Sequence, residues 1–169
     1  EDGNTVSGSG TINEAGQQVT DVDVSGLADG DLTLSTTLTD ELGNESEEKT
    51  DSVVKDTTPA KDYDVSIDQN FINEDNQKEF SFTLEDAEDD SNINYTISDG
   101  DSNTEDITGT VEDVVVDENG NVTVDGIDVS GLEDGDLKLA ATLTDEAGNK
   151  GEEKNDSVIK DTAATEDYD

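Results

Sequence analysis

The sequence predicts an all-β protein made of tandem sandwich domains, with about seven strands in each repeat. Two observations carry this prediction: apolar and polar residues alternate strictly in several short segments, and one long stretch recurs along the chain. Strict alternation is typical of a half-buried antiparallel strand, because successive side chains point to opposite faces. No stretch shows convincing helical periodicity, so we expect strands throughout.

The alternation is clearest at 79–84, which reads EFSFTL, and at 92–97, which reads NINYTI. Turns rich in Asp, Asn and Gly separate such segments. The predicted strands of one complete repeat are 63–67, 79–84, 92–97, 106–111, 121–129, 136–144 and 152–160. Seven short strands within about 100 residues are the signature of an immunoglobulin-like sandwich.

The inward-facing positions of these strands define the predicted core of the complete repeat. Its members are Tyr63, Val65, Ile67, Phe80, Phe82, Leu84, Ile93, Tyr95, Ile97, Val122, Val124, Val129, Leu132, Leu137, Leu139, Leu143 and Val158. This set is small and poor in aromatic residues, so we expect modest stability, at the low end of about 5–15 kcal/mol.

An internal repeat sets the domain boundaries. Residues 23–64 match residues 128–169 at 29 of 42 positions without a gap, at a spacing of 105. A repeat of that length is a whole domain and not a short solenoid unit. The chain then divides into the C-terminal half of one repeat (1–56), a linker (57–61), a complete repeat (62–161), and a linker with the start of the next repeat (162–169).

The linker and the half repeat each carry a further expectation. Pro59 restricts the backbone of the linker and stiffens it. The half repeat has an apolar face without a complete partner sheet, and we expect other strands to cover it, because soluble proteins rarely expose such a patch. That face consists of Ile12, Val22, Val24, Leu32, Leu34 and Leu38.

Composition excludes several classes of function. The chain has 47 Asp and Glu against 8 Lys, a net charge of -39, and no Cys, His, Met or Trp. Without His and Cys it lacks the usual general base, the thiol nucleophile and the zinc ligands, so we do not expect an enzyme. The charge repels nucleic acid and anionic lipid, and no apolar run approaches the ~18 residues of a membrane span. We expect neither binding to nucleic acid nor insertion into a membrane.

Several motifs carry a resemblance that extends over the whole chain. The segment INEDNQKEFSFTLEDAE and the signatures VSGLxDGDLxL, TLTDExGN and DSVxKDT resemble the immunoglobulin-like repeats of giant bacterial surface adhesins. Such repeats occur in calcium-dependent RTX-type and biofilm-associated adhesins and in the gliding-motility adhesins of the Bacteroidetes. The resemblance implies an extracellular stalk at the bacterial cell surface that projects a terminal binding module. The chain departs from the family in its extreme acidity.

Clustered loop acids predict calcium sites where consecutive domains meet. In an immunoglobulin-like sandwich the loops at the two poles would face each other along a tandem array, and converging carboxylates repel unless a cation joins them. Calcium suits such a site because it accepts six to eight oxygen ligands in a forgiving geometry. The candidate ligands are Asp29, Asp31, Asp56, Asp62, Asp86, Asp89, Asp90, Asp145 and Asn149, with Asp134, Asp136 and Asp161 as the next copy. The alternative is ordinary turn chemistry, which also favours Asp, Asn and Gly.

A separate candidate is the segment 99–103, which has the D-x-D-x-N spacing of calcium loops. Its ligands would be Asp99, Asp101 and Asn103. It lacks the glycine and the final acid of an EF-hand, because Thr104 and Thr110 occupy those positions.

The sequence thus leads to one function and one alternative. The first is a structural extender whose partners are neighbouring repeats of the same chain or other copies of it, stiffened by calcium. The alternative is a ligand-binding module for carbohydrate or another surface, which would need an exposed aromatic platform or a flat array of threonines.

Overall fold

The computed structural model describes residues 3–164 and divides the chain between Thr57 and Thr58 into two units. Every paired strand is antiparallel to its sheet neighbours, and no helix occurs among the described residues, which confirms the all-β prediction. In particular, that part of the chain holds no helix long and apolar enough to cross a membrane.

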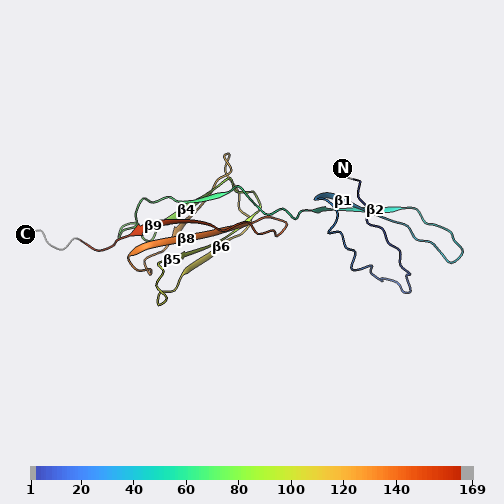
Figure 1. Ribbon diagram of the computed structural model, residues 1–169, viewed down its shortest axis with the longest axis horizontal. Helices are drawn as coiled ribbons and strands as arrows, with labels where there is room; N and C mark the ends of the chain where they lie inside the picture. Colours follow the sequence, from blue (N-terminus) through green and yellow to red (C-terminus); the bar gives the residue numbers. More distant parts are fainter. Residues whose placement is uncertain (1–2, 165–169) are drawn as a thin grey trace, which may run out of the picture. The chain divides into compact units, whose positions relative to one another are not determined.

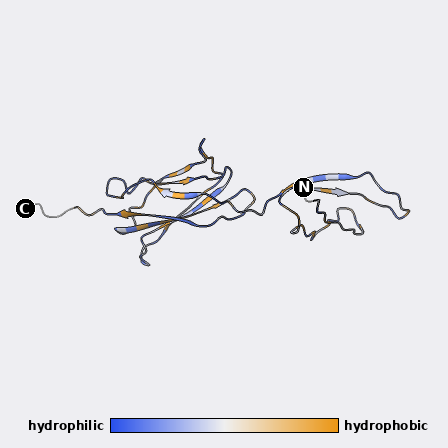
Figure 2. Ribbon diagram, turned by 45° about the horizontal axis from the view of Figure 1, so that its top comes forward, coloured by the Kyte–Doolittle hydropathy of each residue, from blue (hydrophilic) through white to orange (hydrophobic). Residues whose placement is uncertain are grey.

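The second unit is a sandwich of two sheets (Figure 1). The first sheet has the order β3-β4-β7 and consists of β3 (Asp64–Ile67), β4 (Phe80–Glu85) and β7 (Val122–Ile127). The second has the order β6-β5-β8-β9 and consists of β5 (Asn92–Ser98), β6 (Ile107–Val111), β8 (Gly135–Thr144) and β9 (Lys154–Lys160). All seven predicted strands are present, with ends within two residues of the prediction. Figure 2 shows hydrophobic and hydrophilic residues alternating along these strands.

The core of the second unit lies between the two sheets and matches the predicted set. Every predicted core residue is either buried or packed against the core, and the four that are only partly buried are Ile67, Tyr95, Val122 and Val124. Phe82 of β4 and Tyr95 of β5 join the sheets by an edge-to-face contact, with ring centroids 5.2 Å apart. The prediction missed Ile72 and Val114, which come from connections and are fully or almost fully buried.

One aromatic residue, Tyr63, and one glycine, Gly151, fix the segment by which the chain enters the second unit. The hydroxyl of Tyr63 donates a hydrogen bond to the carbonyl of Glu152 and accepts one from the backbone N–H of Leu143 at 3.1 Å. Burial raises the pKa of Tyr63, so the hydroxyl stays protonated and remains a donor. Gly151 permits this contact, because a Cβ there would lie 2.6 Å from the carbonyl oxygen of Ala60 and 2.9 Å from the Tyr63 ring.

The first unit contains a single hairpin among its described residues, made of β1 (Gly30–Thr36) and β2 (Lys49–Lys55) in the register Gly30↔Lys55. These strands correspond to β8 and β9 of the second unit at the spacing of 105. The apolar face predicted for this half is mostly exposed: Leu34 is 61% and Leu38 67% accessible. The described residues include no sheet that covers it.

The close approach at Gly151 generates the first prediction. Gly151→Ala should lower the free energy of unfolding by about 1–3 kcal/mol, because the added methyl overlaps a backbone carbonyl that cannot move freely. Urea denaturation of the full chain measures this. Gly131→Ala is the matched control, since a Cβ at Gly131 meets nothing within 4 Å. An equal effect of the two substitutions would contradict the close contact.

Candidate functional site

A cluster of polar contacts, which we call the exit latch, lies where the chain leaves the second unit. Thr162 donates from its backbone N–H (3.1 Å) and from its hydroxyl (3.0 Å) to the carboxylate of Asp134, in the turn before β8. Lys160, the last residue of β9, is buried and donates its ammonium to the carbonyl of Leu132. The latch therefore fastens both β9 and the residue that follows Asp161 to the loop between β7 and β8.

The first unit has the same latch hydrogen bonds at the spacing of 105, and one ion pair besides. Thr57 donates from its backbone N–H (3.0 Å) and its hydroxyl (3.0 Å) to Asp29. The ammonium of Lys55 donates to the carbonyl of Leu27 at 2.7 Å and also forms an ion pair with Asp29 at 3.0 Å. A device present in both copies belongs to the repeat and not to the surroundings of one copy.

The lysine of the latch determines the local conformation, because its ammonium needs a hydrogen-bond acceptor. A buried ammonium is costly unless it is hydrogen-bonded, so Lys160 selects a conformation in which a carbonyl lies at its tip. Gly135 has φ of 139°, a backbone conformation that glycine adopts without strain, and its counterpart Gly30 has φ of 122°. Lys160 lies on the same face of β9 as Val158 and is buried, and it was not among the core residues expected from the sequence.

Three loops share a second device, the D-x-x-G-N turn, at residues 40–44, 117–121 and 145–149. In each the Asp N–H donates to the Asn carbonyl (3.0, 2.8 and 3.1 Å), and the Asn N–H donates to the Asp carboxylate (2.8, 2.9 and 2.8 Å). The glycines have φ of 88°, 82° and 89°. Asp145 and Asn149, predicted calcium ligands, are thus each other's partners, and the turn at 117–121 was not identified from the sequence.

Hydrogen bonds within two of these turns, 40–44 and 117–121, lower the pKa of the aspartate. The side-chain amide of Asn44, followed by its backbone N–H, lowers the pKa of Asp40. The backbone N–H groups of Asn121 and Asn119 do the same for Asp117. Donors that bind the charged form favour ionisation, so these carboxylates stabilise the turns only while they are ionised.

The candidate ligands nearest the point where the chain enters the second unit are turn residues. Asp62, Asp86 and Asp90 have positive φ, of 67°, 53° and 61°. Asp and Asn tolerate this conformation better than most residues, which is itself a reason for acids at these positions. Asp89 accepts a hydrogen bond from the backbone N–H of Val116 at 2.9 Å.

The remaining candidates lie near the exit or on strands. Asp161 accepts a hydrogen bond from the N–H of Ala163 at 3.0 Å. Asp31 and Asp136 occupy equivalent exposed positions in β1 and β8, and Asp56 directly follows β2. Each therefore lies close in sequence to an exit latch without belonging to it.

The loop between β5 and β6 holds the second calcium candidate, and its acids bind backbone groups. Asp99 accepts from the N–H of Asp101 at 2.8 Å and from the N–H of Glu133 at 2.8 Å, and Asp101 accepts from the N–H and amide of Asn103. The donor from Glu133, followed by that from Asp101, lowers the pKa of Asp99. Asp99 therefore ties this loop to the loop that precedes β8.

No three Asp, Glu, His or Cys side chains lie close enough to hold a metal ion within residues 3–164. The carboxylates of Asp29, Asp134, Asp145 and Asp99 instead accept hydrogen bonds from groups of their own unit. Calcium binding therefore stays a prediction, and each of these four carboxylates has a hydrogen-bonding role within its own unit.

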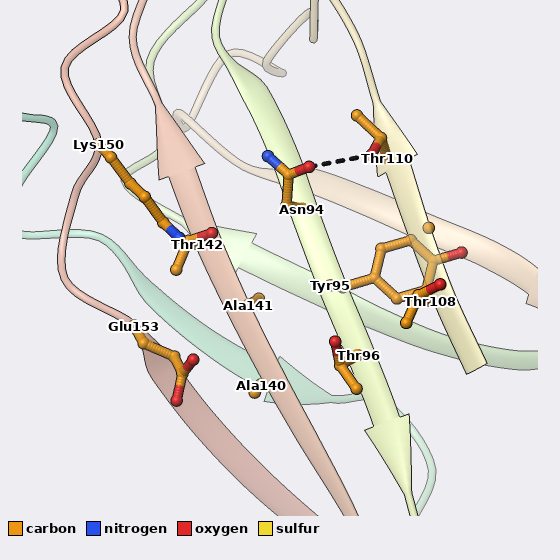
Figure 3. Close-up of a pocket in the computed structure, with 11 residues that line it drawn as sticks. Asn94, Tyr95, Thr96, Thr108, Thr110, Ala140, Ala141, Thr142, Lys150 and Glu153 are labelled. Carbon is orange, nitrogen blue, oxygen red and sulfur yellow. Dashed lines mark hydrogen bonds between the residues drawn. The ribbon is translucent and has the colours of Figure 1, made fainter. Parts of the chain in front are cut away.

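The outer face of the four-stranded sheet differs from the rest of this acidic chain. Among the outward-facing residues of β5, β6, β8 and β9, only Asp136 carries a carboxylate. A hollow of about 500 Å³ lies over this face, with Lys150 and Glu153 at its rim (Figure 3). Its lining includes Asn94, Thr96, Thr108, Thr110, Ala140 and Thr142. Tyr95 offers no open platform for a sugar, because its ring contacts Phe82 and covers Gly109.

The repeated sequence and the repeated latch define a class: the chain is an all-β tandem-repeat protein, and its second unit is a β-sandwich. No protein-family model matches it, and no curated protein matches it. Among solved structures it is similar to a tetra-tandem repeat in the extending region of a large adhesion protein, at 29% identity and a TM-score of 0.48 over 83% of this chain and 34% of that one.

A second similar structure is described as giving insight into host cell surface retention of a 1.5-MDa bacterial ice-binding adhesin. The identity is 22% and the TM-score 0.39, over 79% of this chain and 43% of that one. The present chain thus spans about a third of the first protein and less than half of the second. Both descriptions name adhesion proteins.

The exit latch generates the second prediction. Asp134→Ala should speed hydrogen exchange of the Thr162 amide about five-fold, since one such hydrogen bond contributes about 1 kcal/mol. Amide exchange followed by NMR measures the change. Asp136→Ala is the control, because it removes the same charge two residues away from an exposed strand position. If both substitutions have equal effects, the latch does not hold Thr162.

The lowered pKa of Asp117 generates the third prediction. Its contribution to stability is present at pH values above about 4, the ordinary value for Asp, and is lost as the pH falls through the lower pKa of the folded state. The stability difference between the natural chain and Asp117→Asn should therefore be constant near neutral pH and shrink in acid. Urea denaturation across this pH range measures it.

The control for this pH dependence is Glu118→Gln, which removes the same charge from the same turn. Relief of general repulsion in so acidic a chain would affect both variants alike. An acid-dependent difference of equal size in both would contradict the specific role of Asp117.

Proposed function

We propose that this chain is a structural extender, a stalk segment of a large bacterial cell-surface adhesin, and that it works outside the cell. The observation that carries the proposal is the exit latch, which recurs with the same contacts in both copies of the repeat. A ligand-binding site needs to be built only once, whereas a spacer needs the same fastening at the end of every unit.

The path of the chain through the second unit supports this role. The chain enters beside Glu152, where Tyr63 binds the segment between β8 and β9, and it leaves beside Asp134, before β8 begins. These two points lie at opposite ends of β8, a strand of ten residues. At the usual rise of a β-strand, each repeat would add about 34 Å of length.

Catalysis has little support in the described residues. The hollow on the four-stranded sheet has Lys150 and Glu153 as its charged groups, and both lie at its rim. Threonine and asparagine side chains there have no neighbouring base that would activate them. A net charge of -39 disfavours nucleic acid as a partner, and the internal repeat is the reason to propose neighbouring repeats of the same chain as partners.

The finer part of the proposal is that calcium stiffens the array. Its support is the density of carboxylates at the loops, together with the self-repulsion that they cause without a cation. Extracellular calcium modules bind at about 10⁻⁴–10⁻³ M, and binding to the folded state stabilises it by about 1.4–2.7 kcal/mol per site at ten to a hundred times Kd.

X-ray scattering and thermal unfolding together test both parts of the proposal, the extender role and the binding of calcium. Chains with one and two extra copies of residues 58–162 inserted after Thr162 should gain about 34 Å in maximum dimension with each copy. The maximum dimension and the melting temperature should both be higher in millimolar calcium than in EGTA. Magnesium and sodium chloride at matched ionic strength are the controls.

The outcomes separate the two parts. A maximum dimension that stays constant as copies are added would contradict the extender. Calcium effects that sodium chloride reproduces would contradict calcium binding alone. Asp29→Asn with Asp31→Asn should abolish the calcium effect, whereas Thr57→Val, which weakens the latch but keeps both carboxylates, should leave it in place.

A further inference from the structure

One of the three D-x-x-G-N turns differs from the other two in the residue that precedes its glycine. A leucine precedes the glycine in the turn at 40–44, and an alanine does so in the turn at 145–149. In the turn at 117–121 this residue is Asn119, which is exposed. Asn119–Gly120 is the only Asn–Gly step in the sequence.

An Asn–Gly step can react with itself without an enzyme. The backbone nitrogen of Gly120 loses its proton and attacks the side-chain carbonyl carbon (Cγ) of Asn119, and the new N–Cγ bond closes a succinimide ring. The Cγ–Nδ2 bond breaks, and the side-chain amide takes up the proton and leaves as ammonia. Water then opens the ring. Opening at Cγ leaves aspartate, whereas opening at the main-chain carbonyl leaves isoaspartate, in which the chain runs through the former side chain.

The conformation of the turn keeps this reactive pair in place. Gly120 has φ of 82°, which a residue with a Cβ adopts only with strain, so the turn requires glycine at this position. The same lack of a side chain leaves the nitrogen of Gly120 open to the approach of Cγ. The other two turns have the glycine but not the asparagine, so the reactive pair is confined to the turn at 117–121.

Asp117 restrains both reacting groups while the turn is closed. Its carboxylate accepts the backbone N–H of Asn119 at 2.8 Å, and the side chain of Asn119 also donates to it. The N–H of Gly120, whose nitrogen is the nucleophile, donates to the main-chain carbonyl of Asp117 at 3.0 Å. These contacts must open before the ring can close, so the reaction rate follows the fraction of time that the turn is open.

We propose that Asn119 is a site of spontaneous deamidation, restrained by Asp117, and that the second unit changes slowly and irreversibly through it. Both products add a negative charge two residues from Asp117. Isoaspartate also lengthens the main chain of the turn by one methylene group. The inference goes beyond the extender role and does not depend on it, because the reaction needs only this turn and water.

Conversion of Asn119 would loosen the segments that the turn joins. The N–H of Ala87 donates to the carbonyl of Gly120 at 2.8 Å, which attaches the loop before β5 to the turn. The N–H of Asn121 donates to the carboxylate of Asp117 at 2.9 Å, directly before β7. A longer main chain displaces Gly120 relative to Asp117, and the new carboxylate repels that of Asp117. We therefore expect the amide of Ala87 to lose protection while the core stays intact.

The test is incubation of the full chain for several weeks in mildly alkaline buffer, followed by peptide mapping with mass spectrometry. Asn119 should gain about one mass unit and separate into aspartate and isoaspartate forms. Asn44 and Asn149, the last residues of the other two turns, are internal controls, because a glutamate and a lysine follow them and hinder ring closure. A sample in urea shows the reactivity of the unfolded chain. If Asn119 reacts in urea but not in buffer, the fold prevents the reaction and the proposal is wrong.

The restraint by Asp117 has its own readout. Asp117→Ala should speed the mass gain at Asn119 about five-fold, the factor that loss of one such hydrogen bond implies. Glu118→Ala removes the same charge from the same turn and is the matched control. Equal rates in the two variants would overturn the role of Asp117. Amide exchange of Ala87 should speed up in proportion to the converted fraction in the natural chain, whereas exchange in β5 and β8 should stay unchanged. If Ala87 stays equally protected after conversion, the turn does not hold its loop as proposed.

Discussion

The pairing of β5 with β8 is the interaction on which the rest of the sandwich depends. It brings the apolar residues of two strands into register on one face, and it gives β8 a neighbour on each side, since β9 pairs along its other edge. The first unit shows the consequence of its absence. There β1 and β2 keep their hairpin, but the leucines that face the core in the complete repeat are exposed to solvent.

The acidity of the chain is compatible with a compact fold because the carboxylates serve as hydrogen-bond acceptors. Asp40 and Asp117 close D-x-x-G-N turns, Asp99 joins two loops, and Asp134 holds the departing chain. Each of these contacts satisfies a backbone N–H that a turn would otherwise leave to water. A large negative charge is thus distributed over short local structures, while the core stays apolar.

The strands and the core could be predicted from the sequence because alternation depends on nearest neighbours along the chain. Segments such as 79–84 and 92–97 carry their own pattern, and the structure places them as expected. The latch could not be predicted, because Lys160 finds its carbonyl 28 residues away and only the tertiary fold brings them together. Ile72 was missed for a related reason, since it lies outside any alternating segment.

The acidic loops show a different limit of sequence reasoning. Whether carboxylates converge depends on the directions of their side chains. A hydrogen-bond donor nearby in the sequence often determines the direction of a carboxylate. Asp145 was assigned to a metal because other acids were expected nearby, yet Asn149, four residues on, supplies donors to it. Composition predicts that the chain attracts cations. It does not predict which carboxylate oxygens lie close enough together to bind one.

The contact between the β3–β4 connection and the end of β9 bears on how the second unit would resist tension. The N–H of Ile72 donates to the carbonyl of Ile159 at 2.8 Å, and the N–H of Asp161 donates to the carbonyl of Ile72 at 2.9 Å. The two segments run parallel there, and the chain enters and leaves at opposite ends of the unit. A pull on the two ends loads these bonds along the strand direction, in shear, so they must break together. Resistance to such a pull is governed by the rate of unfolding and not by equilibrium stability, so even a small core can carry load.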